Sequence, residues 1–228
     1  MAKSYFEERR YSYEIIVAAD GDDGTREVAR EIALTDTCIR VIGSSNRRGK
    51  GYGVREAMKL AQGQFVGFAD ADNKTPIEEL DKILEMLLQD WDLVIGSRAQ
   101  RESRIERKQP LYRRMGAKAF AFFMHSIVGL RGIKDTQCGF KFFDRDAAMD
   151  LFRHQRIDGY MFDVEILYLA SQAGYRIGQI PIRWKDDGDS RLQLLRGTIR
   201  NAMDLLRIPL IHRGSDLSWS KNVRRSSC

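Results

Sequence analysis

The sequence predicts an α/β fold in which helices flank a mainly parallel sheet. Short apolar runs rich in β-branched residues alternate with segments whose apolar residues recur at helical spacing. Polar residues follow directly after three of these apolar runs, as expected where parallel strands end at the ligand-binding edge of a sheet. With 228 residues and 43% hydrophobic composition, the chain is long enough to bury a full core as one domain.

The first half of the chain carries the regular part of this alternation. Its apolar runs are short and end at polar or glycine-containing segments, which is typical of strands buried on both faces. The strands are expected at residues 14–19, 39–42, 64–69 and 92–96. Helices are expected from about Thr25, over residues 52–61, and after Pro76, because proline lacks an N–H that the first turn does not need.

The second half is less regular. Pro181 lies in the last expected strand, and because proline cannot donate to a strand ladder, we expect this strand near an edge of the sheet. The expected elements are a helix over residues 113–128, a charged loop followed by an aromatic strand over 132–143, a helix over 161–172 and a strand over 177–184.

Charge and cysteine content narrow the class of protein. The net charge of +6 and the pI near 9.3 fit an anionic partner such as a nucleotide, a nucleic acid or an acidic membrane surface, and a solvated surface explains them equally well. Cys38, Cys138 and Cys228 are odd in number and widely spaced, which favours a reducing compartment and no zinc site. No apolar run reaches the roughly 20 residues of a membrane span, and the first residues lack a signal-peptide core.

The segment FADADNKTP, residues 68–76, ends an apolar strand with two carboxylates one residue apart. If the backbone stays extended, Asp70 and Asp72 point the same way. Two like charges roughly 4 Å apart repel by about 4 kcal/mol at an effective dielectric near 20, so they need compensation. A divalent cation with oxygen ligands would supply it, and so would a shared proton.

A basic, glycine-rich turn follows the second expected strand. Residues 46–53, NRRGKGYG, combine three glycines and three cations with a following helix N-terminus, which are the ingredients of an anion site. The spacing and the missing Lys-Ser/Thr pair exclude a Walker loop. A mobile basic turn is the alternative. Together with the two aspartates, the turn suggests a nucleotide diphosphate held between a metal ion and basic side chains.

Seven segments occur in an order that identifies a family. They are EIIVAADGDDGT, NRRGKGYGVREAM, GQFVGFADADNKTPIEEL, DLVIGSR, GIKDTQCGFKFF, FDVEILYLA and PIRW, and they extend from about Tyr11 to Arg207. In this order they resemble the family 2 inverting glycosyltransferases of the GT-A fold, and among these the dolichyl-phosphate β-glucosyltransferases and their prokaryotic polyprenyl-phosphate relatives. A DxD triplet alone is weak, whereas GIKDTQCGFK after it is specific.

The resemblance implies transfer of a hexose, glucose above all, from a nucleotide sugar such as UDP-glucose to a polyprenyl or dolichyl phosphate with inversion. Asp70 and Asp72 would hold Mg²⁺ or Mn²⁺ bridging the donor diphosphate, and Asp20 would contact the nucleoside. The other donor-side residues that it implies are Arg47, Lys50 and Arg98, the last of them facing a phosphate of donor or acceptor.

Asp135, Gln137 and Lys141 match the segment that lines the acceptor side in similar enzymes. Asp135 and Asp72 are therefore the candidate catalytic residues. Because a phosphate acceptor is already ionised at neutral pH, the reaction hardly needs a strong base, and Asp135 could instead be a helix cap or a loop brace. Metal-assisted departure of the nucleoside diphosphate and in-line positioning would then lower most of the barrier.

Two departures from the family pattern support an alternative. The chain begins with MAKSYFEERR, which resembles the end of a helix that follows the family's first strand, so we expect that strand to be missing from the sheet. Ala19 also replaces a carboxylate often found before Asp20. The alternative is a truncated, inactive nucleotide-binding or membrane-associated remnant. A nucleic-acid binder is not expected, because the cations are spread among acidic residues.

The expected organisation has three parts: an N-terminally incomplete GT-A-like domain over residues 1–190, an amphipathic helix over 191–210 and a polar tail over 211–228. In the helix, Leu192, Leu195, Ile199, Met203 and Leu206 form one apolar face. Arginines 196, 200 and 207 run beside it. This pattern suits a peripheral helix on the cytoplasmic face of an anionic membrane, and a helix packed on the domain with its arginines in water is the alternative.

Overall fold

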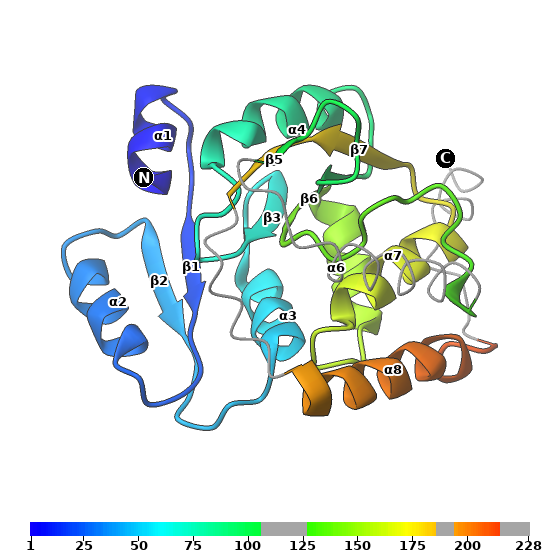
Figure 1. Ribbon diagram of the computed structural model, residues 1–228. Helices are drawn as coiled ribbons and strands as arrows, with labels where there is room; N and C mark the ends of the chain where they lie inside the picture. Colours follow the sequence, from blue (N-terminus) through cyan, green and yellow to red (C-terminus); the bar gives the residue numbers. More distant parts are fainter. Residues whose placement is uncertain (106–126, 186–193, 215–228) are drawn as a thin grey trace.

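The computed structural model describes residues 1–105, 127–185 and 194–214, which form an α/β arrangement around a central sheet (Figure 1). The sheet has four strands in the order β3-β6-β4-β7. These strands are β3 (Phe65–Ala69), β6 (Phe140–Asp144), β4 (Leu93–Ser97) and β7 (Ile177–Pro181). β7 lies at an edge, as predicted from Pro181, and it runs parallel to β4.

Parallel pairing also joins two shorter pairs of strands. β1 (Ile15–Ala18) pairs with β2 (Ile39–Ile42), and β5 (Arg104–Ile105) pairs with β8 (Arg183–Trp184). β6 is the exception, because it runs antiparallel to both β3 and β4. Three of the five strand pairs in the described part of the chain are therefore parallel.

Helices cover both faces of the central sheet. In β4, Leu93 and Ile95 point to one face and Val94 to the other, as the period of two requires. The first face packs against α3 (Lys50–Leu60), α6 (Arg145–His154) and α7 (Phe162–Gln172). The second face packs against α1 (Ala2–Glu8) and α4 (Leu80–Leu87), which follows the short 3₁₀ helix η1 (Ile77–Glu79).

A polar clamp joins α1 to α4. The Tyr5 hydroxyl donates to Asp81 Oδ1 at 2.7 Å, and Arg9 donates to both oxygens of the same carboxylate. The guanidinium of Arg9 also lies 4.0 Å from the centre of the Tyr5 ring. These contacts fix the first helix against the sheet although it is only seven residues long.

β1 and β2 form a separate layer beside the central sheet, covered by α2 (Thr25–Ala33). In the described residues β1 pairs with β2 alone. The Glu14 carboxylate accepts hydrogen bonds from the backbone of Gln62 and Gly63, which tie the start of β1 to the turn before β3. No residue of α2 is buried, so this helix covers the strand pair from the solvent side.

Most expected elements are present, with three differences. Residues 145–154, where no element is expected from the sequence, form α6, whose N-cap Asp144 accepts a hydrogen bond from the backbone of Asp146. The helix after Pro76 starts as 3₁₀ and becomes α-helical only at Leu80. The aromatic strand is antiparallel to its neighbours. The helix expected at 113–128 lies outside the described residues, apart from 127–128.

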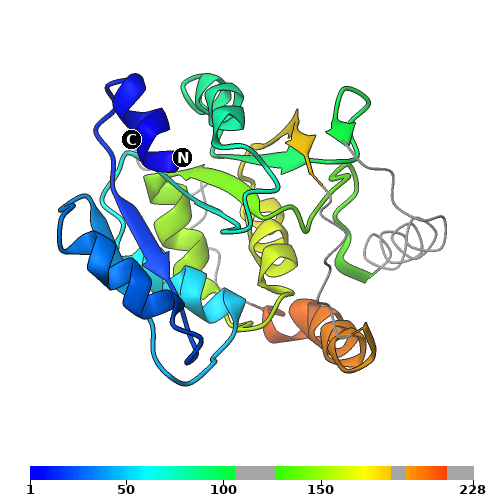
Figure 2. The same ribbon diagram turned by 60° about the vertical axis from the view of Figure 1, so that its left-hand side comes forward.

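The C-terminal helix α8 (Leu194–Ile211) lies at the end of the molecule opposite α1 and α4 (Figure 2). Leu205 and Ile208 bury its inner face. His212 Nε2 lies 2.7 Å from Glu165 Oε1, and Arg156 donates to the carbonyl oxygen of Ile211, so its last turn is fixed to α7 and the loop before it. Within the described ranges, no helix is both long enough and apolar enough to cross a membrane.

Candidate functional site

Asp70 stands where β3 ends against the start of β6. Its backbone N–H donates to the Gly139 carbonyl oxygen at 2.9 Å. Its carboxylate lies flat against Gly139, since a Cβ placed there would stand 2.0 Å from Asp70 Oδ2. Lys50, the first residue of α3, reaches this carboxylate with Nζ 2.5 Å from Oδ1. The glycine of GIKDTQCGFK therefore provides the space that the DxD aspartate occupies.

Asp72 lies two residues further along, in the turn after β3. Its Oδ1 accepts the backbone N–H of Lys74, and the Lys74 ammonium lies 3.2 Å from Oδ2. The side chains of Asp70 and Asp72 are 42% and 46% exposed, so incoming ligands can reach both. Hard carboxylate oxygens suit Mg²⁺ or Mn²⁺, which would complete their coordination with water and phosphate oxygens. The donor chemistry fits the metal that the sequence predicts. Among the described residues no group of three or more His, Cys, Asp or Glu side chains gathers to hold a metal ion.

A buried ion pair lies behind Asp70. The Lys141 side chain is fully buried, and its ammonium contacts the Asp163 carboxylate and donates to the Cys138 carbonyl oxygen at 2.7 Å. Lys141 thus lies inside the domain, and its predicted acceptor-side role stays a prediction. Asp163, at the start of α7, was not expected in the site. The sequence did carry a signal for it, namely an aspartate within the otherwise apolar run FDVEILYLA.

Arg98 and Asp135 form a second ion pair at the end of β4. Asp135 Oδ2 accepts from the Arg98 backbone N–H at 2.9 Å and from Nε at 2.7 Å, while Oδ1 accepts from an Nη at 2.9 Å. Burial raises the pKa of Asp135, but the hydrogen bonds and charge of Arg98 outweigh it, so the pKa stays below its usual value. This geometry favours a brace for Arg98 over a general base, and the base role stays a prediction.

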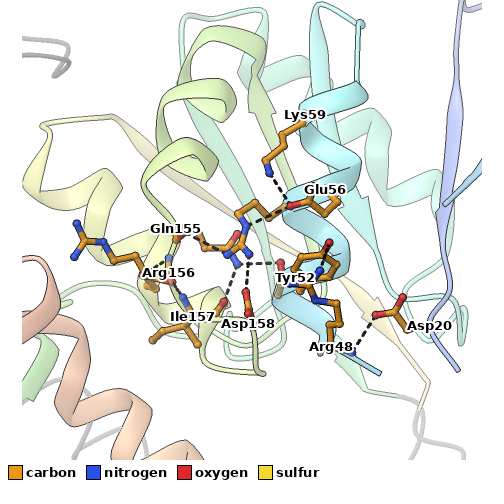
Figure 3. Close-up of polar contacts among 12 residues, drawn as sticks. Asp20, Arg48, Tyr52, Glu56, Lys59, Gln155, Arg156, Ile157 and Asp158 are labelled. Atoms are coloured by element: carbon orange, nitrogen blue, oxygen red, sulfur yellow. Dashed lines mark hydrogen bonds and ion pairs between the residues drawn. The ribbon is translucent and has the colours of Figure 1, made fainter. Parts of the chain in front are cut away.

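Asp20 shapes the basic turn. Its two carboxylate oxygens accept the backbone N–H groups of Ser44 and Arg48, at 3.0 and 3.2 Å, and the Asp20–Arg48 contact is drawn in Figure 3. Arg48 folds back over the ring of Tyr52, 3.7 Å from its centre. Arg47 is 72% exposed and reaches Asp23 at 3.5 Å. Asp20 therefore holds the turn in place, and its predicted contact with a nucleoside stays a prediction.

The start of α3 is fixed against the loop that precedes α7, from residues 155 to 159 (Figure 3). A Cβ at Gly49 would stand 2.3 Å from the Asp158 carbonyl oxygen, and one at Gly51 would stand 2.5 Å from that of Ile157. Arg55 binds the Asp158 carboxylate at 2.7 Å, and Gln155 donates to the Gly51 carbonyl oxygen. These contacts fix the backbone position from which the Lys50 side chain extends.

The structure thus brings together most of the residues expected at the site. Asp70 and Lys50 are in contact, and Lys141 and Asp163 lie behind them, while Arg98 and Asp135 pair at the neighbouring strand end. Asp20 and Arg47 lie in the loops after β1 and β2. Gln137 Nε2 lies 4.0 Å from the Met161 sulfur, a weak contact. Asp163 and Gly139 are the residues that sequence reasoning missed.

Comparison with known proteins agrees with this arrangement. The family model described as "Glycosyl transferase family 2" matches residues 2–152. The chain is 34% identical over 213 residues to a dolichyl-phosphate beta-glucosyltransferase of Trichomonas vaginalis, which covers 91% of this chain and 63% of that protein. The enzyme of the same name from Homo sapiens is 33% identical over 223 residues, covering 92% of this chain and 68% of that protein. The chain thus spans about two thirds of the length of these relatives.

Solved structures share the fold. A glucosyl-3-phosphoglycerate synthase from Mycobacterium tuberculosis, in complex with Mn²⁺, UDP and phosphoglyceric acid, matches with a TM-score of 0.61 at 17% identity, covering 88% of this chain and 68% of that one. The same enzyme in complex with Mn²⁺, UDP-glucose and glycerol 3-phosphate matches with a TM-score of 0.57 at 16% identity. This likeness confirms the GT-A-like fold expected from the sequence. On the family match and the identity to its curated relatives, the chain belongs to glycosyl transferase family 2.

Proposed function

We propose that this chain carries out inverting transfer of glucose from UDP-glucose to dolichyl phosphate or a related polyprenyl phosphate. The observation that carries the proposal is the end of β3, where exposed Asp70 pairs with Lys50 and exposed Asp72 pairs with Lys74. Carboxylates for a divalent cation and an ammonium for phosphate are what a nucleoside diphosphate requires. The names of the curated relatives support glucose as the sugar and dolichyl phosphate as the acceptor.

Asp70 and Asp72 would hold Mg²⁺ or Mn²⁺, which when bound neutralises the diphosphate and makes it a better leaving group. Gly139 and Lys50 hold the Asp70 carboxylate at the strand end. Asp135 orients Arg98, whose guanidinium lies 5.4 Å from the centre of the Trp184 ring. Arg98 is therefore suited to position a phosphate of donor or acceptor. No residue needs to remove a proton, since the acceptor phosphate is already ionised.

Metal-dependent donor binding is the first test. We expect calorimetry with Mn²⁺ to show binding of UDP-glucose in preference to GDP-mannose, and chelation of the metal to weaken this binding. Asp72→Ala should weaken it by about tenfold, since one of two carboxylate ligands is lost. GDP-mannose preference would contradict the proposed donor. Binding without turnover in a dolichyl-phosphate assay would instead favour the catalytically inactive nucleotide-binding remnant.

Membrane association belongs to the same proposal, at the cytoplasmic face of a membrane. On the outer face of α8, Met203, Leu206 and Leu210 are 58%, 49% and 66% exposed. Arg200 and Arg207 are exposed on the same helix. Apolar side chains flanked by arginines suit a helix on an anionic bilayer surface, where a lipid phosphate acceptor is presented. The inner face packs on the domain through Leu205 and Ile208, which leaves the outer face available for the proposed membrane contact.

Vesicle binding tests the outer face of α8. Co-sedimentation with vesicles containing phosphatidylserine should fall severalfold in the Met203→Ser/Leu206→Ser variant, because two exposed apolar contacts are lost. Leu88→Ser is the matched control, since Leu88 is 70% exposed but lies just after α4. Equal loss in both variants, or no loss in either, would refute a role for α8 at the membrane.

A further inference from the structure

Lys50 forms an ion pair with Asp70, the carboxylate that the proposed metal ion would need as a ligand. Its Nζ lies 2.5 Å from Asp70 Oδ1, and the Asp70 side chain is held in this position by the close approach of Gly139. A divalent cation bound to the same carboxylate would face the ammonium as a like charge at short range. The ammonium of Lys50 and a divalent cation therefore compete for Asp70.

A second carboxylate lies near the same ammonium. Burial lowers the pKa of Lys50, but the charges of Asp163 and Asp70 together outweigh it, so the net pKa is raised. Asp163 is almost fully buried and already contacts Lys141, and Lys50 Nζ lies 5.9 Å from the centre of the neighbouring Phe162 ring. An ammonium displaced from Asp70 would still have the Asp163 carboxylate near it.

The backbone around Lys50 is packed more closely than its side chain requires for reaching Asp70. Gly49 and Gly51 press against backbone carbonyl oxygens of residues 157–158, and the Tyr52 N–H donates to the Asp158 carbonyl oxygen at 3.2 Å. The backbone on both sides of Lys50 is therefore fixed. The four-carbon stem of lysine can still turn its ammonium between several acceptors.

We propose that Lys50 is an exchangeable counter-ion, which neutralises Asp70 before the metal binds, leaves it when a divalent cation arrives, and then pairs with the donor diphosphate. This inference rests on the proposed donor site and adds the order of events within it. Lys50 is a positioning residue for Asp70 in one state and a donor ligand in the other. Its removal should therefore have effects of opposite sign on the metal and on the nucleotide.

Mn²⁺ binding in the absence of nucleotide tests the first half. The electron paramagnetic resonance signal of free Mn²⁺ is measured against protein concentration for the parent chain, Lys50→Met and Lys59→Met. Lys50→Met should bind Mn²⁺ about tenfold more tightly, which corresponds to about 1.4 kcal/mol. Lys59→Met is the matched control, because Lys59 lies on the same helix and pairs with Glu56. It should leave the Mn²⁺ affinity unchanged.

UDP binding at saturating Mn²⁺ tests the second half. Lys50→Met should bind UDP more weakly than the parent chain, and Lys50→Arg should retain more of this affinity. Mn²⁺ affinity that is unchanged or lower in Lys50→Met would overturn the proposal while leaving the donor site intact. Failure of the parent chain to bind either Mn²⁺ or UDP would overturn both the donor site and the role of Lys50.

A third measurement observes the Lys50 side chain itself, so its outcome does not depend on whether Lys50→Met folds correctly. Reductive ¹³C-methylation labels the lysine amines, and Lys50→Arg identifies the Lys50 resonance by its absence. Mg²⁺ alone should shift this resonance, and UDP added afterwards should shift it again. A Lys50 resonance that does not respond to Mg²⁺ would overturn the exchange.

Discussion

Gly139→Ala is expected to reduce glucosyl transfer by about 100-fold, the effect typical of a misplacement of about 1 Å at a reacting centre. The new Cβ would lie 2.0 Å from Asp70 Oδ2 and 2.2 Å from Cγ, far inside contact distance. Because Asp70 is 42% exposed, its side chain can swing out into solvent and relieve the clash. The fold should survive, whereas the carboxylate should lose the position in which it contacts Lys50 and would hold the proposed metal ion.

Calorimetry and thermal unfolding together check this prediction. Mn²⁺-dependent UDP binding should fall in Gly139→Ala while the cooperative unfolding transition remains. Gly53→Ala is the matched control, since its Cβ would meet Ala18 at an ordinary 3.5 Å within α3. That substitution should raise stability by about 0.5–1 kcal/mol through helix propensity and leave UDP binding unchanged. Unchanged UDP binding by Gly139→Ala would show that UDP binding does not depend on this position of the Asp70 carboxylate.

The sequence predicted the strand ends more accurately than the contacts between them. Asp70 and Asp72 could be placed at the end of a strand because the apolar run before them is short and stops abruptly. The pairing of Lys50 with Asp70 joins the start of α3 to the end of β3, and no local pattern encodes it. The same holds for Arg98 and Asp135, which are 37 positions apart in the sequence and come together where β4 pairs with β6.

One helix is not predicted from the sequence. No element is expected over residues 145–154, although Asp144 supplies the capping side chain with which α6 begins. Family resemblance predicts Lys141 on the acceptor side, and this role stays a prediction, while the alternation along β6 turns the Lys141 side chain into the domain and onto Asp163. A lysine between aromatic residues in a central strand is expected to be buried together with an oppositely charged partner. The segment GFKFF alone does not indicate which residue that partner is.

Lys141→Met is expected to lower the free energy of unfolding by about 3–5 kcal/mol, a large share of the roughly 5–15 kcal/mol typical of a domain. The Lys141 side chain is fully buried and that of Asp163 is 4% exposed, so the substitution leaves a buried carboxylate without its nearest cation. Urea unfolding at pH 7 measures the loss. Lys59→Met, which removes an exposed partner of Glu56, should cost less than about 1 kcal/mol.

The double variant Lys141→Met/Asp163→Leu distinguishes the cost of an unpaired buried charge from the cost of lost packing. If the cost of the single substitution comes from an unpaired buried charge, removing both charges should restore most of the lost stability.

The pH dependence of the stability of Lys141→Met tests the same point independently. Burial raises the pKa of Asp163, and Lys141 and Lys50 oppose that shift. Without Lys141 the folded state should bind a proton more readily than the unfolded chain, so the stability lost at pH 7 should be partly regained as the pH falls towards 5. A deficit that is independent of pH and persists in the double variant would indicate lost packing instead of an uncompensated charge.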